Sequence, residues 1–80
     1  MPEILRLFGL KFYIYTRDHK PPHVHVVSAD GEARFLVSDT IELMSNHGMK
    51  NKDLRLAESI LEENRELVAE NWVKIHGGED

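Results

Sequence analysis

The segment HVHVVSADGEARFLV, residues 23–37, has the pattern of two antiparallel strands joined by a tight turn. In its first half Val24 and Val26 alternate with two histidines, which is typical of a strand with one buried face. Asp30-Gly31 in the middle is a strong signal for a tight hairpin. The second half alternates again, and its apolar set is Ala33, Phe35 and Val37. This segment therefore predicts the centre of an antiparallel sheet, with both valines facing the core.

The chain before this hairpin is rich in aromatic and β-branched residues, which favour strands. Gly9 interrupts it, so we expect either two strands, at about 3–8 and 10–15, or one long strand with a bulge at the glycine. The inward set of the second part is Leu10, Phe12 and Ile14, and the outward set is Lys11, Tyr13 and Tyr15. After the hairpin, a short strand at about 40–44 and a turn at 45–48 complete the predicted sheet.

From Lys50 onward the hydrophobic period changes to that of an amphipathic helix. The apolar stripe consists of Leu54, Ala57, Ile60, Leu61, Leu67, Val68, Trp72 and Ile75. Asn64 falls on this stripe and is a poor residue inside a helix but a good N-cap. We therefore expect two helices, at about 50–63 and 65–75, with Trp72 anchored in the core.

These elements predict one α+β domain over residues 1–80: a small antiparallel sheet of three to four strands over about 3–44, followed by two C-terminal helices packed on one face. At this length folding buries only about 60% of the surface of the unfolded chain, so a large enclosed pocket is not expected. The chain has no cysteine, so packing or a partner chain, including a second copy in a homo-oligomer, must supply the stability. No apolar run is long enough to span a membrane, and we expect a cytoplasmic protein without membrane contact.

The net charge of −4 is distributed unevenly along the chain. Residues 1–37 carry five basic and four acidic side chains, a net charge of +1, whereas residues 38–80 carry five basic and ten acidic, a net charge of −5. Since Lys and Arg supply most of the affinity for phosphates, any contact with nucleic acid is expected from the first half. The acidic cluster of the helices consists of Glu62, Glu63, Glu66 and Glu70. It fits a solvated helix face or a patch that docks a basic partner.

Three of the five histidines lie close together in the stretch DHKPPHVHV, residues 18–26. Residues i and i+2 of a strand share a face, so His23 and His25 are expected side by side, roughly 6–7 Å apart, on an exposed face opposite the two valines. The residues that neighbouring strands add to this face are Tyr13, Tyr15 and Arg34. The adjoining loop carries Arg17, Asp18 and His19 at its edge.

This surface has three interpretations. Imidazoles titrate near neutral pH, so His23 and His25 could act as the general acid and base of a metal-independent ribonuclease. The binding residues, which offer cations for phosphates and rings for stacking on bases, would then be His19, Tyr13, Tyr15, Arg17, Asp18 and Arg34. Alternatively, His19, His23 and His25 could chelate a Zn²⁺ or Ni²⁺ ion as three neutral ligands. In the third interpretation the histidines are half-exposed structural residues, and no cofactor is bound.

The chain resembles a known bacterial family. Its start MPEILRLFGLKFYIYTRDHKPPHVHV, the Glu32-Ala33-Arg34 strand and the ending ENRELVAENW are similar to the domain of unknown function 4160 family. Members typically carry an Asp-His-x-Pro-Pro-His-x-His core, which maps without a gap onto Asp18, His19, Pro21, Pro22, His23 and His25. The resemblance covers nearly the whole chain. It departs at residues 45–50, where the family tends to have a shorter loop with a proline.

The resemblance implies a place in a gene pair. Genes of this family often stand beside a second small gene, of the domain of unknown function 2442 family, and the pair looks like a type II toxin-antitoxin module. On this analogy we expect a toxin-like protein whose histidine, tyrosine and arginine surface engages RNA or another target and is bound by a small antitoxin-like protein. The alternative is a non-enzymatic module, without toxicity, that binds a protein partner by strand addition or through the acidic helices.

Overall fold

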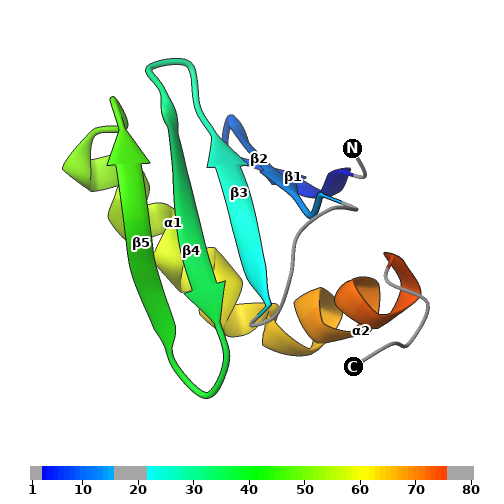
Figure 1. Ribbon diagram of the computed structural model, residues 1–80. Helices are drawn as coiled ribbons and strands as arrows, with labels where there is room; N and C mark the ends of the chain where they lie inside the picture. The colour runs from blue at the N-terminus through cyan, green and yellow to red at the C-terminus, as the bar shows by residue number, and fades with distance from the viewer. Residues whose placement is uncertain (1–2, 16–21, 76–80) are drawn as a thin grey trace.

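A computed structural model describes residues 3–15 and 22–75 of the chain. Within these residues, five strands are followed by two helices (Figure 1). Their bounds are β1 Glu3–Leu7, β2 Leu10–Tyr13, β3 His23–Val27, β4 Glu32–Val37, β5 Ile41–His47, α1 Asn51–Glu63 and α2 Arg65–Ile75. The α+β class and the order of sheet before helices are confirmed, whereas the sheet has five described strands instead of three to four.

The strands form one antiparallel sheet in the order β1-β2-β3-β4-β5, so each strand pairs with its neighbours in the sequence. The expected hairpin between β3 and β4 is present, and the backbone N–H of Ser28 donates to the carbonyl of Gly31 at 2.8 Å. The first segment forms two strands rather than one bulged strand. Phe8 and Gly9 make the turn between them, with φ values of 53° and 78°.

β5 is longer than predicted, because it includes residues that we expected in a turn. Ser45, Asn46 and His47 each lie opposite a residue of β4, and a register shift beside Arg34 leaves Met44 without a directly opposite partner. A bulge of this kind bends a strand while the pairing continues beyond it. The ladder with β4 therefore overrides the local turn composition, and Gly48, with φ of 96°, makes the turn.

The buried apolar residues form one cluster that draws on the sheet, the β5–α1 connection and the helices. Its buried residues are Leu10, Phe12, Ile14, Val24, Val26, Ala33, Phe35, Val37, Ile41, Met49, Ala57, Ile60, Leu61, Val68 and Trp72. α1 contacts β4, β5 and α2, and it crosses behind the sheet in Figure 1. Trp72 is 5% exposed, so its prediction as a core residue is confirmed. Neither described helix is both long and apolar enough to cross a membrane.

Asn64 divides the two helices, as predicted, but its side chain does not cap α2. The side-chain amide donates back to the carbonyl of Ile60 at 2.8 Å, and the backbone N–H donates to the carbonyls of Ile60 and Leu61. The carbonyl of Asn64 accepts a hydrogen bond from the N–H of Val68 at 3.0 Å. Asn64 therefore closes α1 with its side chain and begins α2 with its backbone.

Two glycines allow the β3–β4 turn to contact the connection between β5 and α1. A Cβ atom on Gly31 would lie 2.1 Å from the carbonyl oxygen of His47 and 2.8 Å from the backbone of Gly48. The side chain of Asn46 holds the same connection, because it accepts from the N–H of Met49 at 2.9 Å and donates to its carbonyl at 3.1 Å. These contacts fix where α1 begins against the sheet.

Candidate functional site

The predicted polar surface is built by pairing across β2, β3, β4 and β5. Tyr13 lies directly opposite His25, which lies opposite Arg34. Arg34 in turn lies opposite Ser45. Residues directly opposite each other in an antiparallel pair share a face of the sheet. The four residues therefore form a continuous line across the sheet, which we name the polar row, and the predicted proximity of Tyr13, His25 and Arg34 is confirmed.

Arg34 is the exposed cation of the polar row. Its Nε atom donates to the hydroxyl oxygen of Ser45 at 3.2 Å, which orients the guanidinium group. A guanidinium has five N–H donors in a planar fork, so one bond to a serine still permits it to bind a phosphate or a carboxylate. Ser45 was not predicted on this face, because residues 45–48 have the composition of a turn.

The two histidines are buried, so the prediction that they lie on an exposed face is wrong. His23 and His25 are 9% and 8% exposed. The ring of Tyr15 stacks on His25 with a centroid separation of 3.9 Å and an interplanar angle of 9°. Trp72 of α2 lies against His23, with ring centroids 5.8 Å apart. Strand alternation correctly predicts the side of β3 on which the histidines lie, but it does not predict that these rings cover them.

The four rings of Tyr15, His25, His23 and Trp72 form what we name the aromatic cluster, which connects β3 to α2. The two imidazole centroids are 5.6 Å apart, and their planes are tilted by 57°. A general acid or base must come within hydrogen-bond distance of the reacting group of its substrate. Side chains so little exposed are poorly placed for this.

The metal interpretation depends on His19, which lies outside the described residues, as do Arg17 and Asp18. Among residues 3–15 and 22–75, no three His, Asp or Glu side chains are grouped so that they could hold a metal ion. His23 and His25 supply two imidazoles, and catalytic zinc sites generally use three protein ligands. The roles of the three loop residues stay predictions.

A separate charged pair lies on β1, at the edge of the sheet. Arg6 donates to both carboxylate oxygens of Glu3, through Nε at 2.9 Å and through Nη2 at 2.8 Å. These hydrogen bonds lower the pKa of Glu3 and raise the pKa of Arg6 from their ordinary values. Both groups are at the surface, where water and salt screen such pairs. Glu3 lies directly opposite Tyr13, so the pair adjoins the β2 end of the polar row, where its two charges compensate each other.

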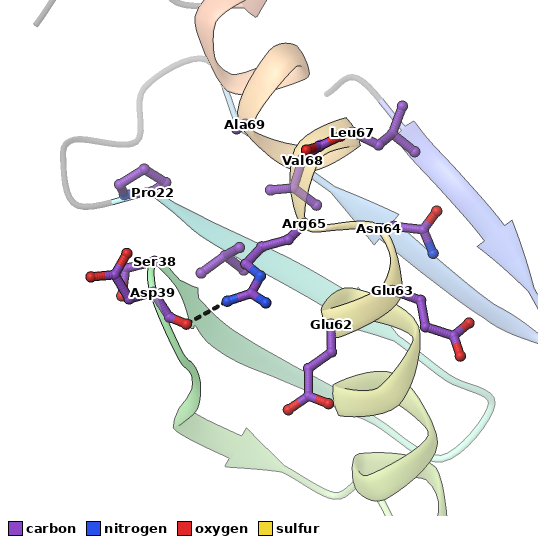
Figure 2. A pocket seen from close by; sticks show the side chains of 12 residues that line it. Pro22, Ser38, Asp39, Glu62, Glu63, Asn64, Arg65, Leu67, Val68 and Ala69 are labelled. Atoms are coloured by element: carbon purple, nitrogen blue, oxygen red, sulfur yellow. Dashed lines mark hydrogen bonds between the residues drawn. The ribbon is translucent and has the colours of Figure 1, made fainter.

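The junction of the two helices borders an open pocket that no pattern in the sequence indicates (Figure 2). Its volume is about 910 Å³, and it is lined by Pro22, Val37, Ser38, Asp39, Glu62, Glu63, Asn64, Arg65, Glu66, Leu67, Val68 and Ala69. Nη1 of Arg65 donates to the backbone carbonyl of Asp39 across this pocket. Three segments far apart in the sequence form the walls, so no local pattern indicates the pocket. We name it the junction pocket.

Comparison with known proteins identifies the family but not a function. No curated protein and no solved structure matches the chain. Residues 9–73 match the family described as Domain of unknown function (DUF4160), and this segment includes the polar row and the aromatic cluster. Because the match covers well over half of the 80 residues, the chain belongs to the Domain of unknown function (DUF4160) family.

Proposed function

We propose that this protein is the toxin-like member of a bacterial toxin-antitoxin pair, and that it acts by binding RNA through the polar row. The observation that supports this proposal most directly is the placement of the exposed Arg34 beside His25 and Tyr13 on one face of the sheet. The family resemblance described above supports the toxin-antitoxin context. A small antitoxin-like protein would silence the toxin by covering this face.

The residue types of the polar row suit a single-stranded nucleic acid. An arginine can bind a phosphate with two parallel hydrogen bonds, and its plane can also stack on a base. Tyr13 is half-buried on the neighbouring strand, and its ring offers a surface for base stacking. Residues 1–37, which contain Tyr13, His25 and Arg34, have a net charge of +1, whereas the acidic side chains concentrate in the rest of the chain.

The histidines support recognition in this proposal rather than chemistry. Tyr15 stacks on His25, and His25 lies between Tyr13 and Arg34 in the polar row. A buried, stacked imidazole holds its strand and its neighbours in fixed positions, which lowers the entropy cost of ordering them when a ligand binds. Because neighbouring rings shield His23 and His25, proton transfer between these imidazoles and a bound RNA is unfavourable. We therefore propose a binding toxin rather than a ribonuclease.

The proposal predicts that Arg34→Ala weakens the binding of a fluorescent single-stranded RNA oligonucleotide about tenfold, because a charge-assisted contact to phosphate is lost. Fluorescence anisotropy at low salt would measure the dissociation constant. Arg55→Ala is the matched control, because Arg55 is an exposed arginine of α1 and should leave binding unchanged.

Growth after expression of the same variants tests the toxin part of the proposal. Expression of the wild type without its neighbouring gene should arrest growth, and Arg34→Ala should relieve the arrest while Arg55→Ala does not.

Equal effects of Arg34→Ala and Arg55→Ala on RNA binding would contradict a role for the polar row. Cleavage of the oligonucleotide by the pure protein, lost in a His25→Ala variant, would contradict recognition without chemistry.

A second candidate function is protein binding by strand addition at β5. This strand is an outer strand of the described sheet, and its apolar Leu43 and Met44 are 48% and 47% exposed. An exposed strand edge can pair with an extended segment of a partner, and apolar side chains beside it add affinity. This candidate fits a module that binds a protein without toxicity.

Strand addition predicts that a Leu43→Lys, Met44→Lys double variant loses the protein partner in a pull-down with the product of the neighbouring gene, because lysines on an edge strand oppose pairing. Val73→Lys is the control, since Val73 is a 54% exposed apolar residue of α2. Retention of the partner by the double variant would exclude the β5 edge as its binding site.

A further inference from the structure

The turn between β1 and β2 contains a residue that neither local geometry nor core packing explains. Phe8 has a φ of 53°, in the left-handed region, where a bulky side chain is strained. Asn, Asp or Gly is preferred at this position of a two-residue hairpin turn. The side chain gains no compensating burial, because it is 76% exposed. Phe8 departs from the residue preference of its turn, and packing within the monomer does not compensate for the strain. This combination points to a contact with another molecule.

The surroundings of Phe8 give its contact surface a positive character. Leu7 beside it is 37% exposed and extends the apolar tip. Arg6 and Lys11 lie directly opposite each other just behind the turn. Glu3 compensates one of these two positive charges, which leaves the β1–β2 hairpin with a net charge of +1. The hairpin thus presents an apolar anchor with a cation behind it.

The junction pocket has the complementary properties. Its apolar lining consists of Pro22, Val37, Leu67, Val68 and Ala69. Its charged lining consists of Asp39, Glu62, Glu63 and Glu66 against a single cation, Arg65, a net charge of −3. Figure 2 shows Glu62 and Glu63 leaving the end of α1 in different directions, and both side chains are exposed. The pocket therefore suits an apolar side chain that is carried on a basic segment.

The hairpin tip cannot enter the pocket of its own chain. Figure 1 shows the β1–β2 turn at one end of the molecule and the α1–α2 junction at the other. We propose that the junction pocket binds the Phe8 hairpin tip of a second copy of this protein. Two copies lying antiparallel, side by side, bring each tip to the pocket of the other, so that both contacts form in one closed two-fold dimer. This inference does not depend on what the polar row binds.

Two variants remove the two halves of the contact separately. Phe8→Asn deletes the anchor, and because Asn tolerates a positive φ, the β1–β2 turn of the monomer should be retained. Ala69→Lys places a long cationic side chain at an exposed helix position of the pocket, where lysine is a good helix former. Each variant should raise the dimer dissociation constant at least about tenfold in sedimentation equilibrium, because Phe8→Asn removes the central apolar anchor and Ala69→Lys obstructs the pocket that receives it.

Mixing the two variants gives a sharper test. Phe8→Asn retains an intact pocket and Ala69→Lys retains an intact tip, so an equimolar mixture restores one of the two contacts and should form a heterodimer more readily than either variant alone forms a homodimer. Val73→Asn is the control, because Val73 is an exposed apolar residue outside both surfaces and should leave dimerisation unchanged. A wild type that stays monomeric at millimolar concentration would overturn the proposal. So would a mixture that associates no more than either variant alone, or an Ala69→Lys variant that dimerises as the wild type does.

Discussion

Replacing Gly31 with alanine is expected to lower the free energy of unfolding by about 3 kcal/mol or more, because the added methyl group overlaps the backbone. Its Cβ would lie 2.1 Å from the carbonyl oxygen of His47 and 2.8 Å from two backbone atoms of Gly48. Backbone atoms cannot move aside as a flexible side chain can, so the β3–β4 turn and the start of α1 must separate. For an 80-residue chain, whose total stability is of the order of 4–12 kcal/mol, this loss is severe.

Urea denaturation followed by circular dichroism would measure this change, with Gly9→Ala as the matched control. Gly9 has a φ of 78°, and a Cβ atom added there would have no heavy atom within 4 Å, so alanine meets strain but no overlap. We expect Gly9→Ala to cost about 1 kcal/mol, the usual penalty for a positive φ. If the two variants lost equal stability, the close approach between the β3–β4 turn and the connection from β5 to α1 would be refuted.

Replacing Trp72 with alanine is expected to lower the free energy of unfolding by about 3–5 kcal/mol, the usual loss for a buried tryptophan. Trp72 is 5% exposed and joins α2 to the core of the sheet. It also lies 5.8 Å from His23, ring centroid to centroid, so its removal uncovers one side of the aromatic cluster. The loss of stability should therefore be accompanied by greater solvent exposure of the His23 imidazole.

Two measurements separate these effects of Trp72→Ala. Denaturation gives the free energy, and the NMR signals of the His23 ring should shift because the neighbouring indole ring current is lost. Val73→Ala is the control, because Val73 is 54% exposed and its truncation should change stability by less than about 0.5 kcal/mol. Unchanged His23 signals in folded Trp72→Ala protein would show that the indole does not cover His23.

Elements with a local hydrophobic period could be predicted from the sequence. The alternation of Val24 and Val26 correctly indicates the buried side of β3, and both side chains are fully buried. The helical stripe indicates both helices, and the break falls at Asn64. The end of β5 could not be predicted in this way, because Ser45, Asn46 and His47 have turn-like composition and are held in the strand by pairing with β4.

The candidate site was only partly predictable for a related reason. Register follows from alternation and hairpin turns, so the grouping of Tyr13, His25 and Arg34 could be predicted. The burial of the histidines could not, because one of the covering rings, Trp72, comes from a helix far along the chain. The junction pocket was also missed, since its walls come from the start of β3, the β4–β5 turn and the helix junction. Contacts between distant segments leave no periodic signal in the sequence.

The order of the strands has a consequence for synthesis on the ribosome. Every strand of the described sheet pairs with the strand before it, so the sheet can grow as the chain emerges. The core residues of the helices, from Ala57 to Trp72, follow all five strands and emerge later. At a synthesis rate of roughly 5–20 residues per second, Phe12 and Phe35 stay uncovered on the nascent sheet for on the order of seconds. Chaperones that bind nascent chains should therefore engage this protein after β5 emerges and release it once α2 has docked.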